Sequence, residues 1–343
     1  MSGPPTFAID ARAAARLELG GVERWARELT TRLPALRPDG YAAMRPPRAL
    51  SHRAGHAWEQ AVLPLRARRL GATALLCPAN LAPIAFARNV VVLHDAAVLR
   101  HPGWYSPAYA AWQRLLLPLI ARRALHVITV SEFSRAELRE LLGVERVSVV
   151  PGGVDPAFSP GADAAQARAT LGLNRPYVLC VASHTARKNL AALVPATRAL
   201  EQDGIELVVA GGHRPQFAAE RGLGGLRLLG HVADGLLPGL YAGAELSVLP
   251  SHYEGCGLPV LESMAAGTPV VAADTTALPE TCGGAARLAA PEGGALRDAL
   301  VALLADAPER ERLRAAGLRR AAGFTWDATA RAVDAVMARC VSP

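Results

Sequence analysis

Two glutamates in the stretch SHYEGCGLPVLESMAAGTPVV (251–271) are spaced so that both could contact one bound ligand. Glu254 precedes a predicted helix, and Glu262 follows within its first turns. Between them, Gly255 and Gly257 allow the backbone to approach a ligand closely. A glycine loop that leads into a helix N-terminus presents free N–H groups and a partial positive charge, which bind phosphate. Because the two carboxylates cannot form a close pair on one helix face, we expect them to contact different parts of the ligand.

The segment ARKNL (186–190) contains Lys188, the only lysine in a chain with 37 lysine and arginine residues. Lysine carries a compact charge on a thin stem, whereas arginine carries a wide planar fork. A sequence that uses arginine everywhere else therefore predicts a role for Lys188 that a guanidinium group cannot fill. The alternative is that one lysine survived by chance.

Short apolar runs alternate with longer helical patterns along the chain. The runs are continuously apolar, which is typical of parallel strands covered on both faces. Alternation of such strands with helices predicts a doubly wound α/β fold, and there are enough runs for two sheets. They cover residues 7–10, 74–78, 90–95, 126–131, 147–153, 177–183, 205–212, 226–230, 245–251 and 268–273.

The length of 343 residues favours two domains. Prolines and the lack of an apolar face at the start of the segment 155–176 predict a link there. We predict a first domain over residues 1–155, a second over 156–325, and a final amphipathic helix within 326–343.

Composition narrows the class of protein. No run of 18 apolar residues and no secretory leader are evident, so we expect a cytoplasmic protein. Five cysteines without paired spacing indicate reduced thiols. The net charge of +7 is concentrated in residues 1–150, which permits nucleic acid, an anionic membrane or an acidic substrate as a partner; the alternative is plain solubility.

Ligands of doubly wound sheets bind at the carboxyl ends of the strands. Polar residues and glycines that directly follow the apolar runs are therefore site candidates. They include Gly20, Gly21, His94, Asp95, Ser131, Arg187, Lys188, His231 and Glu254.

The chain resembles the retaining glycosyltransferases of the GT-B fold, family 4. The resemblance rests on the Glu254-x7-Glu262 spacing with GLPVLESMAAGTPVV, and on several shorter stretches in the same order as in that family. These are GGVERWARELTTRL (20–33), VVLHDAAVLRHPGWYS (91–106), VITVSEFSRAEL (127–138), VSVVPGGVD (147–155), RKNL (187–190), LLGHVAD (228–234) and ALPETCGGAA (277–286). The resemblance implies two Rossmann-like domains that face each other, with the C-terminal helix 326–343 packed back on the first domain.

The resemblance also implies a donor site in the second domain and gives each of its residues a role. Arg187 and Lys188 would bind the donor diphosphate, and Glu262 the ribose hydroxyls. Glu254 would lie beside the transferred sugar. The nucleotide base would be bordered by His231 and Val232, while backbone N–H groups of Cys256, Gly257 and Leu258 would meet sugar hydroxyls or the distal phosphate.

In the first domain, the resemblance places His94 and Asp95 against the sugar, so that with Glu254 they form the expected catalytic set. Gly20 and Gly21 would contact phosphate. Ser131 is an acceptor candidate that could equally cap the next helix.

The aromatic and basic stretch WYSPAYAAWQRLLLPLIARR (104–123) is a candidate for contact with an acceptor or a membrane, with Trp104 and Tyr105 as its acceptor residues. The alternative is an ordinary helix packed on the first sheet.

Two positions depart from the family pattern. Ala182 stands where many relatives have a phosphate-binding arginine, and Cys256 stands where phenylalanine is usual. No D-x-D occurs in the chain, so we expect no metal and no cofactor beyond the nucleotide sugar. Departure of the diphosphate would then depend on fixed positive charges.

Other functions compete with transfer of a sugar to a glycan, a lipid-linked sugar or a natural product. One is a nucleotide-sugar epimerase on a similar scaffold, and another is a nucleic-acid or membrane binder that uses the basic half. A phosphorylase is disfavoured because it would need a pyridoxal lysine, and the RKNL setting of Lys188 does not suit that role. A nicotinamide dehydrogenase is disfavoured because no G-x-G-x-x-G follows the first strand. UDP is favoured over GDP as the donor nucleotide. The basic first half of the chain permits peripheral contact with a membrane. An antibiotic oligosaccharide of the orthosomycin type is one acceptor that fits the resemblance.

Overall fold

The computed structural model describes residues 6–16, 20–47, 55–212, 217–218, 220–342 of the chain. They form two compact units. The first unit comprises Met1–Arg100, Ala111–Gly153 and Trp326–Pro343, and the second comprises His101–Ala110 and Val154–Thr325. The segment 101–110, which the sequence analysis assigned to the first domain, therefore groups with the second unit.

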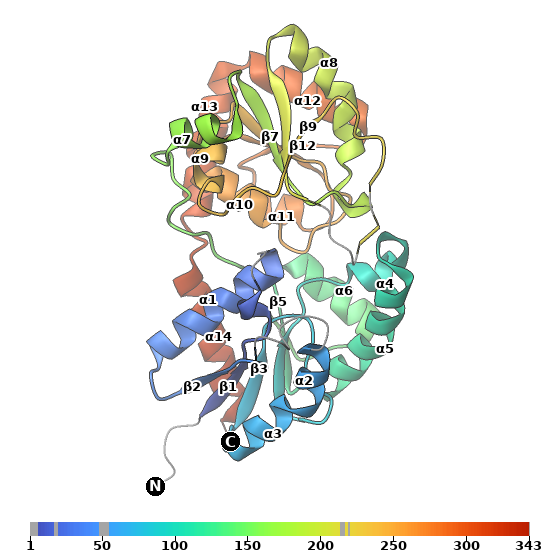
Figure 1. Ribbon diagram of the computed structural model, residues 1–343, viewed down its shortest axis with the longest axis vertical. Coiled ribbons are helices and arrows are strands. Elements are labelled where there is room, and N and C mark those ends of the chain that lie inside the picture. Colours follow the sequence, from blue (N-terminus) through green and yellow to red (C-terminus); the bar gives the residue numbers. More distant parts are fainter. Residues whose placement is uncertain (1–5, 17–19, 48–54, 213–216, 219, 343) are drawn as a thin grey trace. The chain divides into compact units, whose positions relative to one another are not determined.

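The first unit contains a six-stranded sheet in the order β2-β1-β3-β4-β5-β6, with parallel pairing throughout (Figure 1). Its strands are β1 (Phe7–Asp10), β2 (Tyr41–Met44), β3 (Ala74–Cys77), β4 (Asn89–Val92), β5 (His126–Thr129) and β6 (Val147–Val149). Its helices are α1 (Gly21–Leu36), α2 (Gly55–Ala61), α3 (Leu63–Arg69), α4 (Ala97–Arg100), α5 (Pro107–Arg123), α6 (Glu132–Leu142) and α14 (Trp326–Val341). The part of α5 before Ala111 groups with the second unit.

The second unit repeats this architecture with the strand order β12-β11-β10-β7-β8-β9, again parallel (Figure 1). Its strands are β7 (Tyr177–Val181), β8 (Glu206–Ala210), β9 (Arg227–Gly230), β10 (Leu246–Leu249), β11 (Val270–Ala273) and β12 (Arg287–Ala289). Its helices are α7 (Ala164–Leu171), α8 (Val194–Gln202), α9 (Leu237–Ala242), α10 (Leu258–Ala265), α11 (Leu278–Cys282), α12 (Gly293–Ala305) and α13 (Ala307–Ala321).

Burial on both faces of the second sheet explains why its strands read as continuous apolar runs. In β7, Tyr177 and Leu179 belong to the core cluster on one face, while Val178 and Cys180 belong to the cluster on the other. Helices α9 and α10 contribute to the first cluster, and α8 and α12 to the second. The predicted doubly wound α/β class is confirmed.

The C-terminal helix α14 belongs to the first unit. Trp326 packs edge-on against Trp25 of α1, with ring centroids 5.9 Å apart. The hydroxyl of Tyr41 donates to Asp334 at 2.9 Å, and that of Thr329 donates to the carbonyl of Pro151 at 2.8 Å. These contacts join the last helix of the chain to the first helix and the first edge strand.

Candidate functional site

A buried ion pair lies at the carboxyl ends of two neighbouring strands of the second unit. Lys188 follows β7 in a short 3₁₀ turn (Ala186–Lys188), and Glu254 follows β10. Because β7 and β10 pair in parallel, both loops leave the same edge of the sheet. Lys188 Nζ donates to Glu254 Oε1 at 2.5 Å, and the two residues are only 8% and 5% exposed. The sequence candidates Lys188 and Glu254 thus meet directly.

Electrostatics keep Glu254 charged despite its burial. Burial by itself would raise the pKa of Glu254, but the positive charges of Lys188 and Arg187 and hydrogen bonds from Lys188 and Ser251 outweigh it, so the pKa lies below its ordinary value. Ser251 Oγ donates to the same carboxylate oxygen as Lys188, at 2.7 Å. The site therefore holds an anion and a cation side by side with little water around them.

Three neutral residues that the sequence analysis did not select hold these loops in place. Asn189 adopts a left-handed conformation with φ of 56°, and its amide donates to the carbonyls of Pro250 and Pro291. Thr276 Oγ1 accepts the backbone N–H of Glu254 at 2.9 Å, and Thr275 donates to the carbonyl of Ser251. Their one sequence signal is that they follow or border predicted strands.

The glycine loop after Glu254 leads into α10 as predicted. Gly257 caps the helix with φ of +81°, and a Cβ there would lie 2.7 Å from Leu278 Cδ2, so both conformation and space favour glycine. Glu262 lies inside α10, is 6% exposed, and accepts a hydrogen bond from the Tyr241 hydroxyl at 3.4 Å. Cys256 is half-buried, and its carbonyl accepts a bond from the Thr281 hydroxyl.

Arg187 adds positive charge near the carboxylate of Glu254. Ala182 is buried, and its carbonyl oxygen lies 2.1 Å from the point that a Cβ on Gly211 would occupy. Arg187 is close enough to Glu254 to lower the pKa of its carboxyl group. Its guanidinium lies 5.9 Å from the ring centre of Phe217. We infer that Arg187, together with Lys188, makes this edge of the sheet attractive to an anion.

The two residues expected at the nucleotide base differ in exposure. His231 is exposed, whereas Val232 is 5% exposed and belongs to the core of the second unit. Leu258, expected to offer its backbone N–H, is the first residue of α10. These donor-site candidates lie in the second unit, whereas the donor-binding candidates Gly20 and Gly21 lie in the first.

Five candidates lie in the first unit, where they make local structural contacts. His94 is buried; its Nε2 lies 2.9 Å from the carbonyl of Pro78, and its ring meets Trp25 edge-on. Burial lowers the pKa of His94, which therefore stays neutral near pH 7. Asp95 accepts the backbone N–H of Ala97 at 3.0 Å.

The remaining candidates of the first unit occupy helix starts. Gly20 is the N-cap of α1 and Gly21 its first residue, and the N–H of Gly20 donates to Glu23 Oε2 at 3.0 Å. Ser131 caps α6 by accepting the N–H of Ser134 at 3.0 Å. These contacts give each residue a structural role, and their roles toward a ligand stay predictions.

The first unit also contains a buried charged cluster that the sequence analysis missed. Arg12 Nε donates to Glu59 Oε2 at 2.5 Å, and the N–H of Arg12 donates to Asp10 Oδ1 at 3.0 Å. All three residues are at most 2% exposed. Burial, with the nearby charge of Asp10, raises the pKa of Glu59 to about 7. Asp10 could have been found, because it directly ends the first apolar run.

The acceptor candidates Trp104 and Tyr105 belong to the segment 101–110 of the second unit. Tyr105 is 8% exposed and packs on Phe217 and Tyr109, whereas Trp104 is half-buried beside His101 and His252. Among the residues that the structure describes, no group of three or more histidine, cysteine, aspartate or glutamate side chains could hold a metal ion.

Two family profiles match parts of this chain. Residues 175–306 match the profile of "Glycosyl transferases group 1", and residues 71–158 match that of "Glycosyltransferase Family 4". The O-antigen chain mannosyltransferase B of Escherichia coli is 31% identical over 261 residues, which cover 71% of this chain and 68% of that protein. The chain belongs to the group 1, family 4 glycosyltransferases. The MMP alpha-(1->4)-mannosyltransferase of Mycolicibacterium hassiacum is 31% identical over 253 residues, or 70% of this chain and 60% of that protein.

Solved structures share the fold of this glycosyltransferase. Sucrose-phosphate synthase from Thermosynechococcus elongatus has a TM-score of 0.77 at 21% identity, with 98% of both chains covered. WaaG, a glycosyltransferase involved in lipopolysaccharide biosynthesis, has a TM-score of 0.71 at 15% identity, with 97% of this chain and 99% of that chain covered. The Anabaena protein HepE in complex with UDP-glucose has a TM-score of 0.71 at 18% identity, with coverage of 98% and 99%. These likenesses confirm the predicted GT-B architecture.

Proposed function

We propose that this glycosyltransferase is a retaining, metal-independent enzyme that moves a sugar from a nucleoside-diphosphate donor to an acceptor hydroxyl. The observation that carries the proposal is the buried Lys188–Glu254 pair beside the glycine-capped start of α10. A diphosphate carries the charge that Lys188, Arg187 and a helix N-terminus attract. Family membership favours transfer over epimerisation and over nucleic-acid binding.

In the proposed reaction, fixed positive charge stabilises the leaving diphosphate. Lys188, Arg187 and the first N–H groups of α10 act on its developing negative charge in a site with little water. The acceptor hydroxyl attacks the anomeric carbon from the face that the nucleotide leaves, and a phosphate oxygen takes its proton. Glu254 contacts the transferred sugar.

The other sequence candidates keep their proposed roles. Glu262 holds the ribose, His231 and Val232 border the base, and backbone N–H groups of Cys256, Gly257 and Leu258 meet the sugar or phosphate. His94 and Asp95 act on the transferred sugar, and Gly20 and Gly21 on phosphate.

Donor and acceptor are proposed as classes. UDP is the first candidate nucleotide, with GDP second. The structurally similar protein HepE was solved in complex with UDP-glucose, while two proteins similar in sequence are named mannosyltransferases. The acceptor is a glycan, a lipid-linked sugar or a natural product, and an antibiotic oligosaccharide falls within this last class.

A thermal-shift titration with UDP, GDP, ADP and dTDP, each with and without EDTA, tests the donor proposal. At 100 times its Kd, the correct nucleotide should stabilise the protein by about 2.7 kcal/mol. The shift should survive EDTA, and the sugar transferred from that donor should keep its anomeric configuration by NMR. The absence of a shift with all four nucleotides would contradict the donor site, and a shift lost in EDTA would contradict metal independence.

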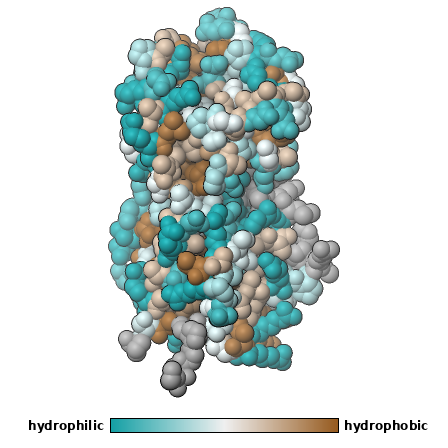
Figure 2. All heavy atoms as spheres, turned by 90° about the vertical axis from the view of Figure 1, so that its left-hand side faces the viewer, coloured by the Kyte–Doolittle hydropathy of each residue, from teal (hydrophilic) through white to brown (hydrophobic). Residues whose placement is uncertain are grey.

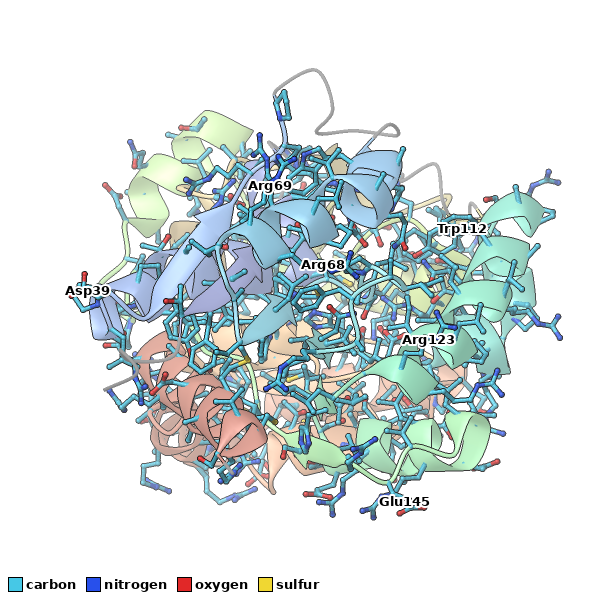
Figure 3. All side chains as sticks on the ribbon, turned by 90° about the horizontal axis from the view of Figure 1, so that it is seen from below. Asp39, Arg68, Arg69, Trp112, Arg123 and Glu145 are labelled. Atoms are coloured by element: carbon cyan, nitrogen blue, oxygen red, sulfur yellow. The ribbon has the colours of Figure 1, made fainter. Side chains whose placement is uncertain are left out.

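We further propose that the first unit contacts an anionic membrane through α3 and α5. Neither helix contains an acidic residue. Their arginines Arg66, Arg68, Arg69, Arg114, Arg122 and Arg123 are exposed, as are the apolar Leu65, Trp112 and Leu115. Arg68 and Arg123, both labelled in Figure 3, donate to the adjacent carbonyls of Ala85 and Ile84, so the two helices contact the same loop. Exposed arginines with interleaved apolar side chains suit an interfacial surface.

This contact would be peripheral. No helix in the described part of the chain is long and apolar enough to cross a membrane. Charge would contribute about 1 kcal/mol per basic residue near an anionic surface. Figure 2 shows the side that lies to the left in Figure 1, where hydrophobic residues are scattered among hydrophilic ones.

Replacing Arg68, Arg69 and Arg123 with glutamate should reduce binding to anionic vesicles about 100-fold. Co-sedimentation measures this binding, with phosphatidylcholine vesicles that contain about 30 mol% of the anionic lipid phosphatidylglycerol. The matched control replaces the exposed Arg198, Arg314 and Arg319 of the second unit with glutamate, which changes the net charge equally. Equal losses in both variants would show that only net charge matters, and would refute a specific surface.

A further inference from the structure

An aromatic surface lies next to the Lys188–Glu254 pair in the second unit. Trp104 stacks on His101, with ring centroids 4.0 Å apart. The ring of His252 is 11° from parallel with that of Trp104 at a centroid distance of 6.3 Å, so these two rings are stacked with an offset and do not cover each other fully. We call Trp104, His101 and His252 the aromatic platform.

The platform is supported from within the unit. Tyr253 is 2% exposed and meets the rings of both His101 and Trp104 edge-on, at 6.0 and 6.4 Å. The carbonyl of Trp104 accepts the N–H of Ala218 at 2.9 Å. Rings held in this way present a surface without further ordering when a ligand binds, which lowers the cost of binding.

Anchoring of the segment 101–110 does not by itself account for the platform. Tyr105 already fastens this segment through a β-bridge to Phe217 and a ring contact at 5.1 Å. Tyr105 is buried, as an anchor should be, whereas His101 and His252 are exposed and Trp104 is half-buried. The three rings therefore keep aromatic surface in contact with solvent.

The position of the platform identifies its ligand class. His252 lies between Ser251 and Glu254 in sequence, separated from Glu254 only by Tyr253, and its N–H donates to the carbonyl of Arg187 at 3.0 Å. The platform is thus continuous with the loops that hold the proposed donor site. Sugar rings have an apolar C–H face that packs on aromatic rings, while their hydroxyls need polar neighbours.

We propose that the aromatic platform binds the ring of a saccharide acceptor, with the indole of Trp104 as its main contact. This inference rests on the proposed function, since it names the acceptor class and the residues that hold it. It assigns the contact to Trp104 and leaves Tyr105 as an anchor. The donor sugar is a less suitable occupant, because Glu254 beside it is buried and the platform is exposed.

The test measures saccharide binding separately from nucleotide binding. The protein is first saturated with the nucleotide that stabilises it. It is then titrated with methyl α-D-glucopyranoside, methyl α-D-mannopyranoside or maltotriose, and saturation-transfer NMR measures the binding of each saccharide. Trp104→Ala should weaken binding of the best saccharide about 10-fold or more, and Trp104→Phe, which keeps a flat ring, should weaken it about 3-fold or less. Val301→Ala is the control, since Val301 is an apolar side chain on α12 of the second unit that is 38% exposed and belongs to none of the proposed sites.

His252→Ala provides a second variant should Trp104→Ala disturb the segment 101–110, and it should weaken saccharide binding about 3-fold. The nucleotide thermal shift should stay unchanged in both variants, which separates this inference from the donor proposal. Unchanged saccharide binding in Trp104→Ala and His252→Ala, or no binding of any of the three saccharides to the wild type, would overturn the platform. Loss of nucleotide affinity with saccharide binding retained would show that the rings bind the base, and would overturn it too.

Discussion

Replacing Lys188 with methionine is expected to reduce kcat/KM for glycosyl transfer by about 10²–10³-fold. Methionine keeps the length of the side chain and removes the ammonium that would stabilise the leaving diphosphate. The affinity for the nucleoside diphosphate should fall about 10- to 100-fold, since a charge-assisted hydrogen bond contributes about 1.5–3 kcal/mol. Steady-state kinetics and titration calorimetry measure the two effects.

Two controls separate loss of charge from loss of structure. Lys188→Met leaves the buried Glu254 without its cation, so the variant is also expected to be less stable. The double variant Lys188→Met with Glu254→Gln removes both charges and should recover stability without recovering activity. The nucleoside itself, which lacks phosphate, should bind the wild type and Lys188→Met equally; a parallel loss of nucleoside binding would contradict a phosphate role for Lys188.

Replacing Glu254 with glutamine should abolish most transfer while strengthening binding of the nucleoside diphosphate. In the wild type, the Glu254 carboxylate accepts a hydrogen bond from the Lys188 ammonium at 2.5 Å, and its negative charge repels an incoming diphosphate. Glutamine removes this negative charge, so we expect about 10-fold tighter nucleotide binding. Without nucleotide, the buried ammonium loses its charged partner, and the free energy of unfolding should fall by about 3 kcal/mol.

The pH dependence of stability gives an independent measurement. The pKa of Glu254 is lowered in the folded protein, so its contribution to stability is present above the unfolded pKa and is lost as pH falls through the folded value. The stability difference between wild type and the double variant Lys188→Met with Glu254→Gln, which carries neither charge, should thus be constant from about pH 8 to 5 and shrink at more acidic pH. Urea unfolding at several pH values measures it. A difference that instead grows on acidification, or weaker nucleotide binding by Glu254→Gln, would contradict the ion pair described here.

Most of the strands that could be predicted are buried on both faces of a sheet. All ten predicted runs contain strands, and in eight of them this burial leaves a continuous apolar signal. The edge strands β6 and β9 are mostly not buried but were also predicted. The strands β2 and β12 were missed: β2 is a short edge strand with two alanines, and β12 has three residues that begin with an arginine, so neither stood out as a run of large apolar side chains.

Rare residue types marked the site, and common ones did not. Lys188 stood out as the only lysine, and Glu254 as an acid in a glycine loop after a strand. Ser251, Asn189 and Thr276 hold the same loops by hydrogen bonds, but neutral polar residues are abundant in loops, so their position near predicted strands did not distinguish them.

The sequence by itself determined the α/β class, the order of elements and which side chains follow the strands, because these depend on local patterns of burial and backbone conformation. Only the tertiary structure decided which of those side chains meet. Lys188 and Glu254 are 66 positions apart, and they touch because β10 pairs with β7 across a crossover in the sheet. Likewise, residues 101–110 group with the second unit because Tyr105 pairs with Phe217, a contact between distant residues that no local pattern encodes.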